Sequence, residues 1–181
     1  SPNTTRSNIE RLIDREIDHA REGKEAKFWV KINYISDHSM IDKLYEASDA
    51  GVKIRMIVRG IFCLDINNSK AHNITAISVV GRFLEHTRAF CFHNSGEPEY
   101  YISSADWMGR NLNRRVEVTA PIYDESIQRE IRDHFEILWK DNLKSRHLDA
   151  NQKNDYKVQQ GPKINGQEEL YDYVRKLLGK G

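Results

Sequence analysis

A strand, a helix and a second strand follow one another in the first third of the chain, and this pattern constrains the fold most. Apolar residues alternate over 28–32, as in a strand, and 52–58 is a second apolar run. Between them, apolar residues at helical spacing predict a helix over 37–49, which Gly51 ends. A connection of this length is typical of parallel strands, because antiparallel neighbours need only a tight turn. The sequence therefore predicts a βαβ unit.

Later segments extend the predicted sheet and add helices. Apolar spacing predicts three more helices, over 9–20, 125–140 and 167–178. Further strands are predicted at 76–80, 88–92, 100–103 and 115–121. The polar segments 65–73 and 151–166 are expected to be connections, the second with at most one short strand. Together these elements predict an α/β fold in which helices flank a mixed β-sheet.

Composition indicates one compact, soluble domain over 1–181, because this length can bury a real core. Lys and Arg number 28 against 27 for Asp and Glu, so no global basic field draws in a polyanion. Any anion site must therefore come from local clustering of arginine. The chain opens with Ser1 instead of methionine, directly before a helical pattern, and we expect it to be a fragment of a longer protein.

The cysteines and the apolar runs indicate a cytoplasmic protein. Cys63 and Cys91 lie far apart, without metal-ligand spacing, and each sits in an apolar stretch, so both are expected to be buried and reduced. No apolar run approaches the roughly 20 residues that cross a bilayer, and no signal-peptide pattern opens the sequence. Peripheral contact with the inner membrane stays open as an alternative.

The segment 81–118 gathers residue types that bind phosphate. The candidates are His86 and Arg88 and, after a predicted hairpin turn at 94–98, Ser103, Ser104 and Asp106. Arginine offers bidentate donors to phosphate oxygens, hydroxyls add neutral donors, and histidine can attack phosphorus or shuttle a proton. Asp106 can orient a neighbouring histidine. A structural histidine, and a turn stabilised by serine and aspartate, fit the same sequence.

A second group of candidates lies where predicted strands end. Arg59 and Gly60 follow the strand at 52–58, and Lys31 and Asn33 end the strand before it. Ligands of α/β sheets gather at carboxyl ends of strands, where glycine lets the backbone approach an anion. Ordinary surface polarity is the alternative. Two further arginines can complete an anion pocket, Arg110 and Arg115. Five other histidines are expected to be surface or packing residues: His19, His38, His93, His134 and His147.

These motifs resemble those of a known family. From SPNTTRSNIERLIDREIDHAREGK through KINYISDHSMIDKLYEASDAGVKIRMIVRGIFCL to SSADWMGRNLNRRVEV, the chain resembles the carboxy-terminal domain of bacterial polyphosphate kinase. The order of His86, Arg88 and the serine pair also resembles one half of a phospholipase D-like site, with Arg88 where that superfamily usually has lysine. The resemblance implies a phospholipase D-like half-fold.

The resemblance also implies a function. Polyphosphate kinase transfers the terminal phosphate of ATP reversibly to polyphosphate, releasing ADP, through a phosphohistidine and with magnesium. In that family the FLEH histidine, here His86, contacts the transferred phosphate, and the histidine that becomes phosphorylated lies in the preceding domain. We expect His86 to orient phosphate or act as a general acid, with a nucleophilic role as a lesser alternative.

Other residues and partners follow from the same resemblance. The VRG motif places Arg59 on a nucleotide phosphate, and Arg115 matches a family site position. Homo-oligomers are implied, and the missing N-terminal domains would be partners. No Asp/Glu cluster here would hold magnesium alone, so we expect the ion to be bound mainly outside this chain and assign no metal ligand. The isolated chain is expected to turn over little.

Two other classes of function compete with the kinase. A phospholipase D-type phosphodiesterase or nuclease is supported by the order of His86 and Ser104, but Arg88 in place of lysine changes the charge geometry. A nucleic-acid-binding module would use the arginines as a basic patch. The near-neutral charge and the lack of a nucleic-acid-binding motif weigh against it, so no nucleic-acid partner is expected.

Overall fold

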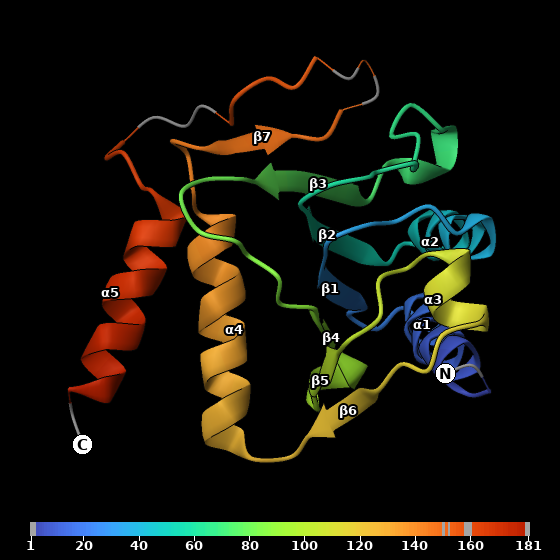
Figure 1. Ribbon diagram of the computed structural model, residues 1–181. Coiled ribbons are helices and arrows are strands. Elements are labelled where there is room, and N and C mark those ends of the chain that lie inside the picture. The colour runs from blue at the N-terminus through green and yellow to red at the C-terminus, as the bar shows by residue number, and fades with distance from the viewer. Residues whose placement is uncertain (1–2, 150, 152, 158–160, 180–181) are drawn as a thin grey trace.

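A seven-stranded mixed sheet forms the centre of the molecule (Figure 1), as seen in a computed structural model that describes residues 3–149, 151, 153–157 and 161–179. Its strand order is β6-β5-β4-β1-β2-β3-β7. The strands are β1 (Lys27–Ile32), β2 (Lys53–Val58), β3 (Ile74–Val79), β4 (Ala89–Phe92), β5 (Glu99–Ser103), β6 (Thr119–Ile122) and β7 (Ser145–His147). The first three run parallel, and every other pairing is antiparallel.

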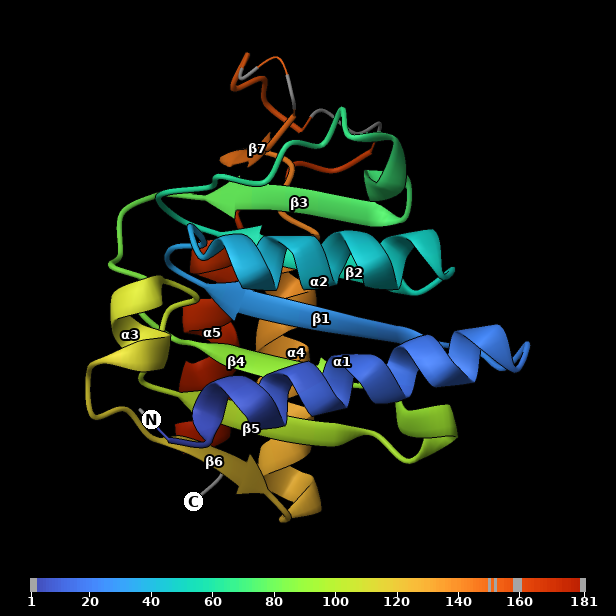
Figure 2. The same cartoon turned by 90° about the vertical axis from the view of Figure 1, so that its right-hand side faces the viewer.

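Helices cover both faces of this sheet and give three layers (Figure 2). The helices are α1 (Thr5–Arg21), α2 (His38–Asp49), α3 (Gly109–Asn113), α4 (Glu125–Trp139) and α5 (Gly166–Leu178), with short 3-10 turns at Ser69–Ala71 and Asn94–Gly96. Helices α1 and α2 lie on one face, and α4 and α5 lie on the other. The predicted α/β class, with helices flanking a mixed sheet, is confirmed.

Helix α2 begins where Asp37 caps it. The Asp37 side chain accepts a hydrogen bond of 3.1 Å from the Met40 amide, which satisfies one of the free donors of the first turn. Arg6 of α1 donates to both oxygens of the same carboxylate, at 2.8 and 2.6 Å. One buried carboxylate therefore starts α2 and ties it to α1.

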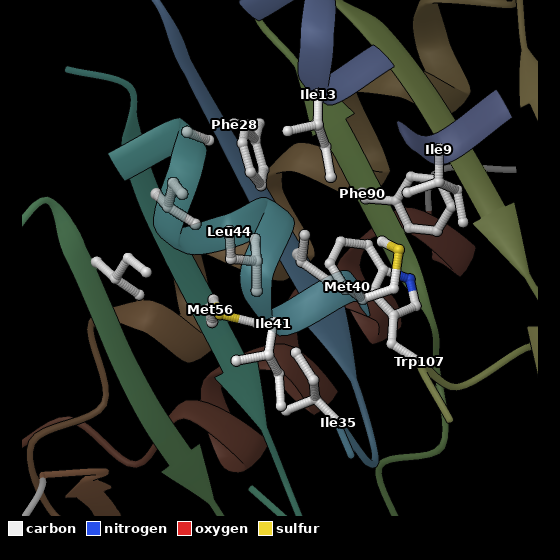
Figure 3. Close-up of a cluster of buried hydrophobic side chains, with 14 of the residues drawn as sticks. Ile9, Ile13, Phe28, Ile35, Met40, Ile41, Leu44, Met56, Phe90 and Trp107 are labelled. Atoms are coloured by element: carbon white, nitrogen blue, oxygen red, sulfur yellow. The ribbon is translucent and has the colours of Figure 1, made fainter. Parts of the chain in front are cut away.

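The main core lies between the sheet and the helices α1 and α2 (Figure 3). Ile13 of α1 and Leu44 of α2 point toward side chains of the central strands, such as Met56 and Phe90. Trp107 is completely buried at one end of this cluster, with its ring 6.3 Å from that of Phe90. Trp107 thus closes this end of the core against β4.

A smaller aromatic core lies under α4. The rings of Trp29 in β1 and Phe135 in α4 stack with their centroids 4.3 Å apart. Arg55 of β2 lies over the Phe135 ring at 5.2 Å and pairs with Glu136. This cluster attaches α4 to the sheet and determines which side of α4 faces the loop between β3 and β4.

Two predicted elements differ from the structure. The strand expected at 115–121 starts only at Thr119, because residues 109–113 coil into α3 and the amide of Arg115 bonds back to the carbonyl of Arg110. Strand β7 was not predicted, since its sequence Ser-Arg-His is polar. It forms because the Asp141 carboxylate accepts hydrogen bonds from the amides of residues 143–145 and places them beside β3.

Two further expectations can be compared with the structure. Cys91 is buried in β4, but Cys63 is exposed, so the prediction of two buried thiols is wrong for Cys63. Its amide bonds to the Ile35 carbonyl in an irregular segment after β2, which leaves the side chain outside the core. The turn at 94–98 is confirmed between β4 and β5. Within the predicted connection at 151–166, residues 152 and 158–160 lie outside the described part.

Candidate functional site

Several of the predicted site residues lie at the edge of the sheet where the parallel strands end. Asn33 follows β1 and Arg59 follows β2. The segment 80–88 leaves β3 at the same edge and enters β4, whose first residue, Ala89, pairs with Lys31. Because β1 and β2 separate β3 from β4 in the sheet, this segment passes the ends of both strands. The carboxyl-end prediction is therefore correct for Lys31, Asn33 and Arg59.

Arg88 and Asp106 form a buried ion pair at the centre of this edge. The Arg88 Nη2 atom donates to Asp106 Oδ2 at 2.8 Å, and the two side chains are 11% and 4% exposed. The other carboxylate oxygen, Oδ1, accepts from the amides of Asn33 and Tyr34 at 2.7 and 3.1 Å. Asp106 therefore ties the end of β1 to the start of β4 and neutralises the guanidinium that it holds.

The exposed His86 lies against the same guanidinium. Arg88 Nη1 is 3.3 Å from His86 Nδ1, and Nη2 is 3.4 Å from Nε2. A neutral imidazole has a single acceptor nitrogen, so at most one of these contacts is a hydrogen bond. The sequence predicts that Asp106 orients a neighbouring histidine, and the contact that the structure describes between Asp106 and His86 runs through Arg88.

Lys31 lies beneath the segment that carries His86. Its ammonium donates to the Thr87 carbonyl at 3.1 Å and lies 3.4 Å from Glu85 Oε2. Burial lowers the pKa of Lys31; the Glu85 carboxylate opposes this, and the charges of Arg59 and Arg88 lower it further. Only 4% of Lys31 is exposed, so surface polarity does not explain this residue.

Glu85 connects Lys31 to α4. Its Oε2 atom is 3.2 Å from Nε2 of His134. Burial raises the pKa of the Glu85 carboxyl, but the hydrogen bond from His134 and the charge of Lys31 outweigh it, so that the pKa is lowered overall. The sequence predicts His134 to be a surface or packing residue. It is a packing residue with a specific contact to the segment that carries His86.

The hydroxyls of the two serines bond mainly to residues 117–119, which lead into β6. Ser103 Oγ lies 2.8 Å from Thr119 Oγ1 and accepts from the Ala105 amide at 3.0 Å. Ser104 Oγ bonds to Glu117 and accepts from the Val118 amide at 3.1 Å. These contacts favour the structural alternative that the sequence left open. As phosphate donors, both hydroxyls would have to leave partners that they already have.

The arginines outside the ion pair differ in their position. Arg59 is half-buried beside Gly60, where a Cβ atom would overlap the ring of Tyr34, so glycine is required for this close approach. Its charge is near enough to Lys31 to lower the pKa of that residue. Arg110 and Arg115 are exposed at α3, and no contact among the described residues joins them to His86.

Buried polar atoms without protein partners remain beside the ion pair. The side-chain amide of Asn33, which is 1% exposed, has no partner for its oxygen or nitrogen within the described part of the chain, and neither has Nε of Arg88. Buried polar groups normally find a hydrogen-bond partner. Water or a ligand therefore fits these atoms, and three cations, Lys31, Arg59 and Arg88, face two carboxylates. The chemistry of the site suits an anion.

Two features are missing from the residues that the structure describes. Among the residues that it describes, no three His, Cys, Asp or Glu side chains are grouped to hold a metal ion. The same residues contain no helix long and apolar enough to span a membrane.

Comparison with known proteins first defines the fold. The structure resembles the crystal structure of a phospholipase D family member, Nuc from Salmonella typhimurium, with a TM-score of 0.53 at 10% identity over 74% of this chain and 88% of that one. The chain thus has a phospholipase D-like fold. A family model described as polyphosphate kinase C-terminal domain 2 matches residues 1–167. The chain belongs to this polyphosphate kinase family.

Individual relatives agree with the family. The polyphosphate kinase of Vibrio vulnificus (strain YJ016) is 44% identical over 180 residues, which are 98% of this chain and 26% of the relative. The crystal structure of polyphosphate kinase from Porphyromonas gingivalis superposes with a TM-score of 0.94 at 39% identity, over 98% of this chain and 28% of that one. This chain therefore spans about a quarter of the length of its relatives.

Sequence reasoning missed the residues that support the site. Glu85 directly precedes His86, and this adjacency was the signal that could have found it. His134 lies 49 positions from its partner, and Gln167 of α5, which bonds to Phe83, lies 84 positions away. Spacing along the chain gives no indication of either contact.

Proposed function

We propose that this chain is the carboxy-terminal catalytic domain of a polyphosphate kinase and forms one wall of its active site. The full enzyme would transfer the terminal phosphate of ATP reversibly to polyphosphate, with ADP as the other product. The observation that carries the proposal is the exposed His86 beside the Arg88–Asp106 ion pair, within a chain of this family. The phosphorylated histidine would lie in the preceding domain of the longer chain.

Each residue has a defined task in this proposal. His86 orients the transferred phosphate or gives a proton to it, since its ring is exposed beside the guanidinium. Arg88 and Arg59 supply fixed positive charge to phosphate oxygens. Lys31 adds charge from below the loop, and Asp106 holds Arg88 in place. A preorganised cation stabilises a phosphoryl group without reorganising during transfer.

The carboxylates in the site also have a purpose. Three cations crowded at one edge of the sheet would repel each other without compensation. Glu85 and Asp106 reduce this repulsion, and each accepts from the cation that it neutralises. The edge keeps an excess of positive charge, which suits a polyanionic substrate.

Magnesium is implied by the kinase reaction, but these residues do not provide a centre for it. The described part of the chain contains no ligand cluster, and both carboxylates nearest His86 are already bonded to cations or amides. We therefore assign the ion to parts of the enzyme outside this chain. A cytoplasmic homo-oligomer is the expected setting of the full enzyme.

The test compares three forms of the full-length protein that contains this chain. Wild type should make polyphosphate from ATP with magnesium, and His86→Ala should lower the rate about 100-fold or more. His147→Ala, which removes an exposed histidine in β7, should retain the rate. Polyphosphate synthesis by His86→Ala at the wild-type rate would remove this residue from the mechanism.

The fold likeness to phospholipase D supports one alternative, a phosphodiesterase. If wild type makes no polyphosphate but hydrolyses DNA or phospholipid, and His86→Ala loses that activity, the phosphodiesterase replaces the kinase. Inactivity in both assays would refute both functions.

A further inference from the structure

The segment that carries His86 has no regular secondary structure of its own. Residues 80–88 form neither helix nor strand, so no backbone ladder fixes them. His86 is exposed within this segment and cannot be held by burial. The position of its ring therefore depends on side chains from elsewhere that bind the backbone on either side of it.

One of these side chains comes from the last helix. Gln167, the second residue of α5, is 3% exposed, and its Oε1 accepts from the Phe83 amide at 2.9 Å. Its Nε2 donates to the carbonyl of the same residue at 2.8 Å. The glutamine amide thus makes with Phe83 the two backbone hydrogen bonds that a neighbouring strand would make in a sheet. Among side chains that are ordinarily uncharged at neutral pH, only the amides of Gln and Asn present a donor and an acceptor side by side, and Asn is one methylene shorter.

The surroundings of Gln167 are built for this contact. At Gly81, a Cβ atom would overlap Gln167 Oε1, so glycine leaves room for the amide to reach the backbone. The ring of Phe83 also stacks on Tyr171 of α5, with centroids 6.1 Å apart. The start of α5 is itself fixed, because the Gly166 amide donates to the buried Asp141 carboxylate at 2.7 Å.

A second set of contacts holds the other side of His86. Lys31 binds the Thr87 carbonyl, and His134 and Lys31 both contact Glu85. His86 is therefore held between an anchor at Phe83, from α5, and anchors at residues 85 and 87, from α4 and β1. Since the first anchor consists of two hydrogen bonds from a single amide, one substitution removes it.

We propose that Gln167 is a positioning residue, through which α5 sets the place of the His86 imidazole relative to Arg88. The proposal rests on the proposed function, because only that function gives the positioned ring a role in phosphoryl transfer. A displacement of about 1 Å of a catalytic group can lower a rate about 100-fold. Gln167 acts only through the loop that carries His86 and is not itself a catalytic residue.

The first test is structural and independent of activity. In the full-length protein, Gln167→Leu removes both hydrogen bonds at nearly the same size. Hydrogen exchange followed by mass spectrometry should then show faster exchange over 80–88, by about tenfold or more. Each lost hydrogen bond lowers the free energy of local opening by an amount that corresponds to about a tenfold change in the exchange rate. Gln128→Leu is the matched control, because it removes the bond from Gln128 to the Ile122 carbonyl at the far end of β6.

The second test measures turnover. Gln167→Leu should lower kcat about tenfold or more and leave the KM for ATP nearly unchanged, while Gln128→Leu keeps both. Gln167→Glu gives a pH readout, because a protonated carboxyl donates and accepts as the amide does, and an ionised one cannot donate. The ratio of its kcat to that of wild type should rise as the pH falls toward the carboxyl pKa.

The outcomes separate this proposal from the proposed function. Unchanged exchange over 80–88 in Gln167→Leu overturns the anchor, whatever the activity. Faster exchange with the turnover of wild type overturns the positioning role. If the ratio of the kcat of Gln167→Glu to that of wild type does not vary with pH, this also contradicts the positioning role. Gln167→Glu is the variant to use if Gln167→Leu fails to fold. If wild type makes no polyphosphate, the proposed function fails, and exchange alone decides whether Gln167 fixes the loop.

Discussion

Arg88 and Asp106 form an ion pair of 2.8 Å in which both partners are almost fully shielded from solvent. Both terminal nitrogens of the same guanidinium also lie close to the His86 ring, so a single side chain bonds to a buried carboxylate and contacts an exposed imidazole. A planar fork with two terminal nitrogens can make both contacts at once, whereas a lysine ammonium presents one point of charge. The phospholipase D superfamily usually has a lysine at the position of Arg88, and the arginine found here allows two contacts where a lysine would present one charge.

Replacing the fork by a point charge should impair the enzyme without removing its charge. We expect Arg88→Lys to lower the rate of polyphosphate synthesis by the full-length protein about tenfold or more, because one of the two contacts is lost. Steady-state kinetics with ATP measure this. Arg129→Lys, on the exposed side of α4, is the control and should have the wild-type rate. A normal rate for Arg88→Lys would show that charge alone suffices.

Asp37 should contribute strongly to stability, because it caps α2 and binds Arg6. We expect Asp37→Ala to lower the free energy of unfolding by about 3 kcal/mol, which combines a lost cap with a lost charged hydrogen bond. Urea unfolding at pH 7 measures the difference. A loss below about 1 kcal/mol would mean that the pair with Arg6 adds nothing to the cap.

The same residue gives a pH dependence. Burial raises the pKa of Asp37, but the hydrogen bonds from Arg6 and from the Met40 amide outweigh it, and the pKa is lowered overall. The stabilisation is therefore complete above the unfolded-state pKa of about 3.9 and is lost as the pH falls through the lower folded-state pKa. The stability difference between wild type and Asp37→Asn should persist at pH 5–7 and shrink below about pH 4. A difference that stays constant down to pH 2 would contradict this.

The two cysteines should react very differently with thiol reagents. Burial raises the pKa of the Cys91 thiol to about 12, so its thiolate is scarce at neutral pH, whereas Cys63 is exposed. Iodoacetamide at pH 8 should modify Cys63 in the folded protein and reach Cys91 only in denaturant. Peptide mass spectrometry distinguishes the two. Equal labelling of both in the folded state would contradict the burial of Cys91.

Gly81→Ala should reproduce part of the effect of losing Gln167, because the added methyl group meets the glutamine amide. We expect faster hydrogen exchange over 80–88, and little further increase when Gln167→Leu is added, since both changes break one contact. Gly109→Ala is the control, because a Cβ there would make only ordinary contacts, such as 3.5 Å to Asp37 Oδ2. Additive effects of the two changes would mean that they act on different contacts.

Sequence patterns predicted the parts of the fold that depend on repeated apolar spacing. The βαβ unit and the long helices were correct because each repeats one preference over many residues. Helix α3 was missed because it is short and follows directly after the buried Trp107. Strand β7 was missed because hydrogen bonds to an aspartate that precedes it in the chain hold it in place. Neither has enough residues for a periodic signal.

The candidate site was predictable as residue types but not as contacts. The carboxyl ends of β1 and β2 indicated Lys31 and Arg59, since parallel strands bring their ends to one edge. The partners of the loop were not predictable, because Gln167 and His134 come from helices later in the chain. Ser103 and Ser104 show the reverse case, in which a phosphate-binding pattern is used to join the end of β5 to the start of β6.

The passage of the loop across the ends of β1 and β2 has a consequence for the order of folding. Its two ends enter β3 and β4, which β1 and β2 separate in the sheet, and its anchor at Phe83 requires the last helix. Contacts between distant parts of a chain form late, because their loop-closure entropy must first be offset. We therefore expect the surroundings of His86 to be the last region to become native. Refolding kinetics of Gln167→Leu should show faster unfolding with an unchanged folding rate.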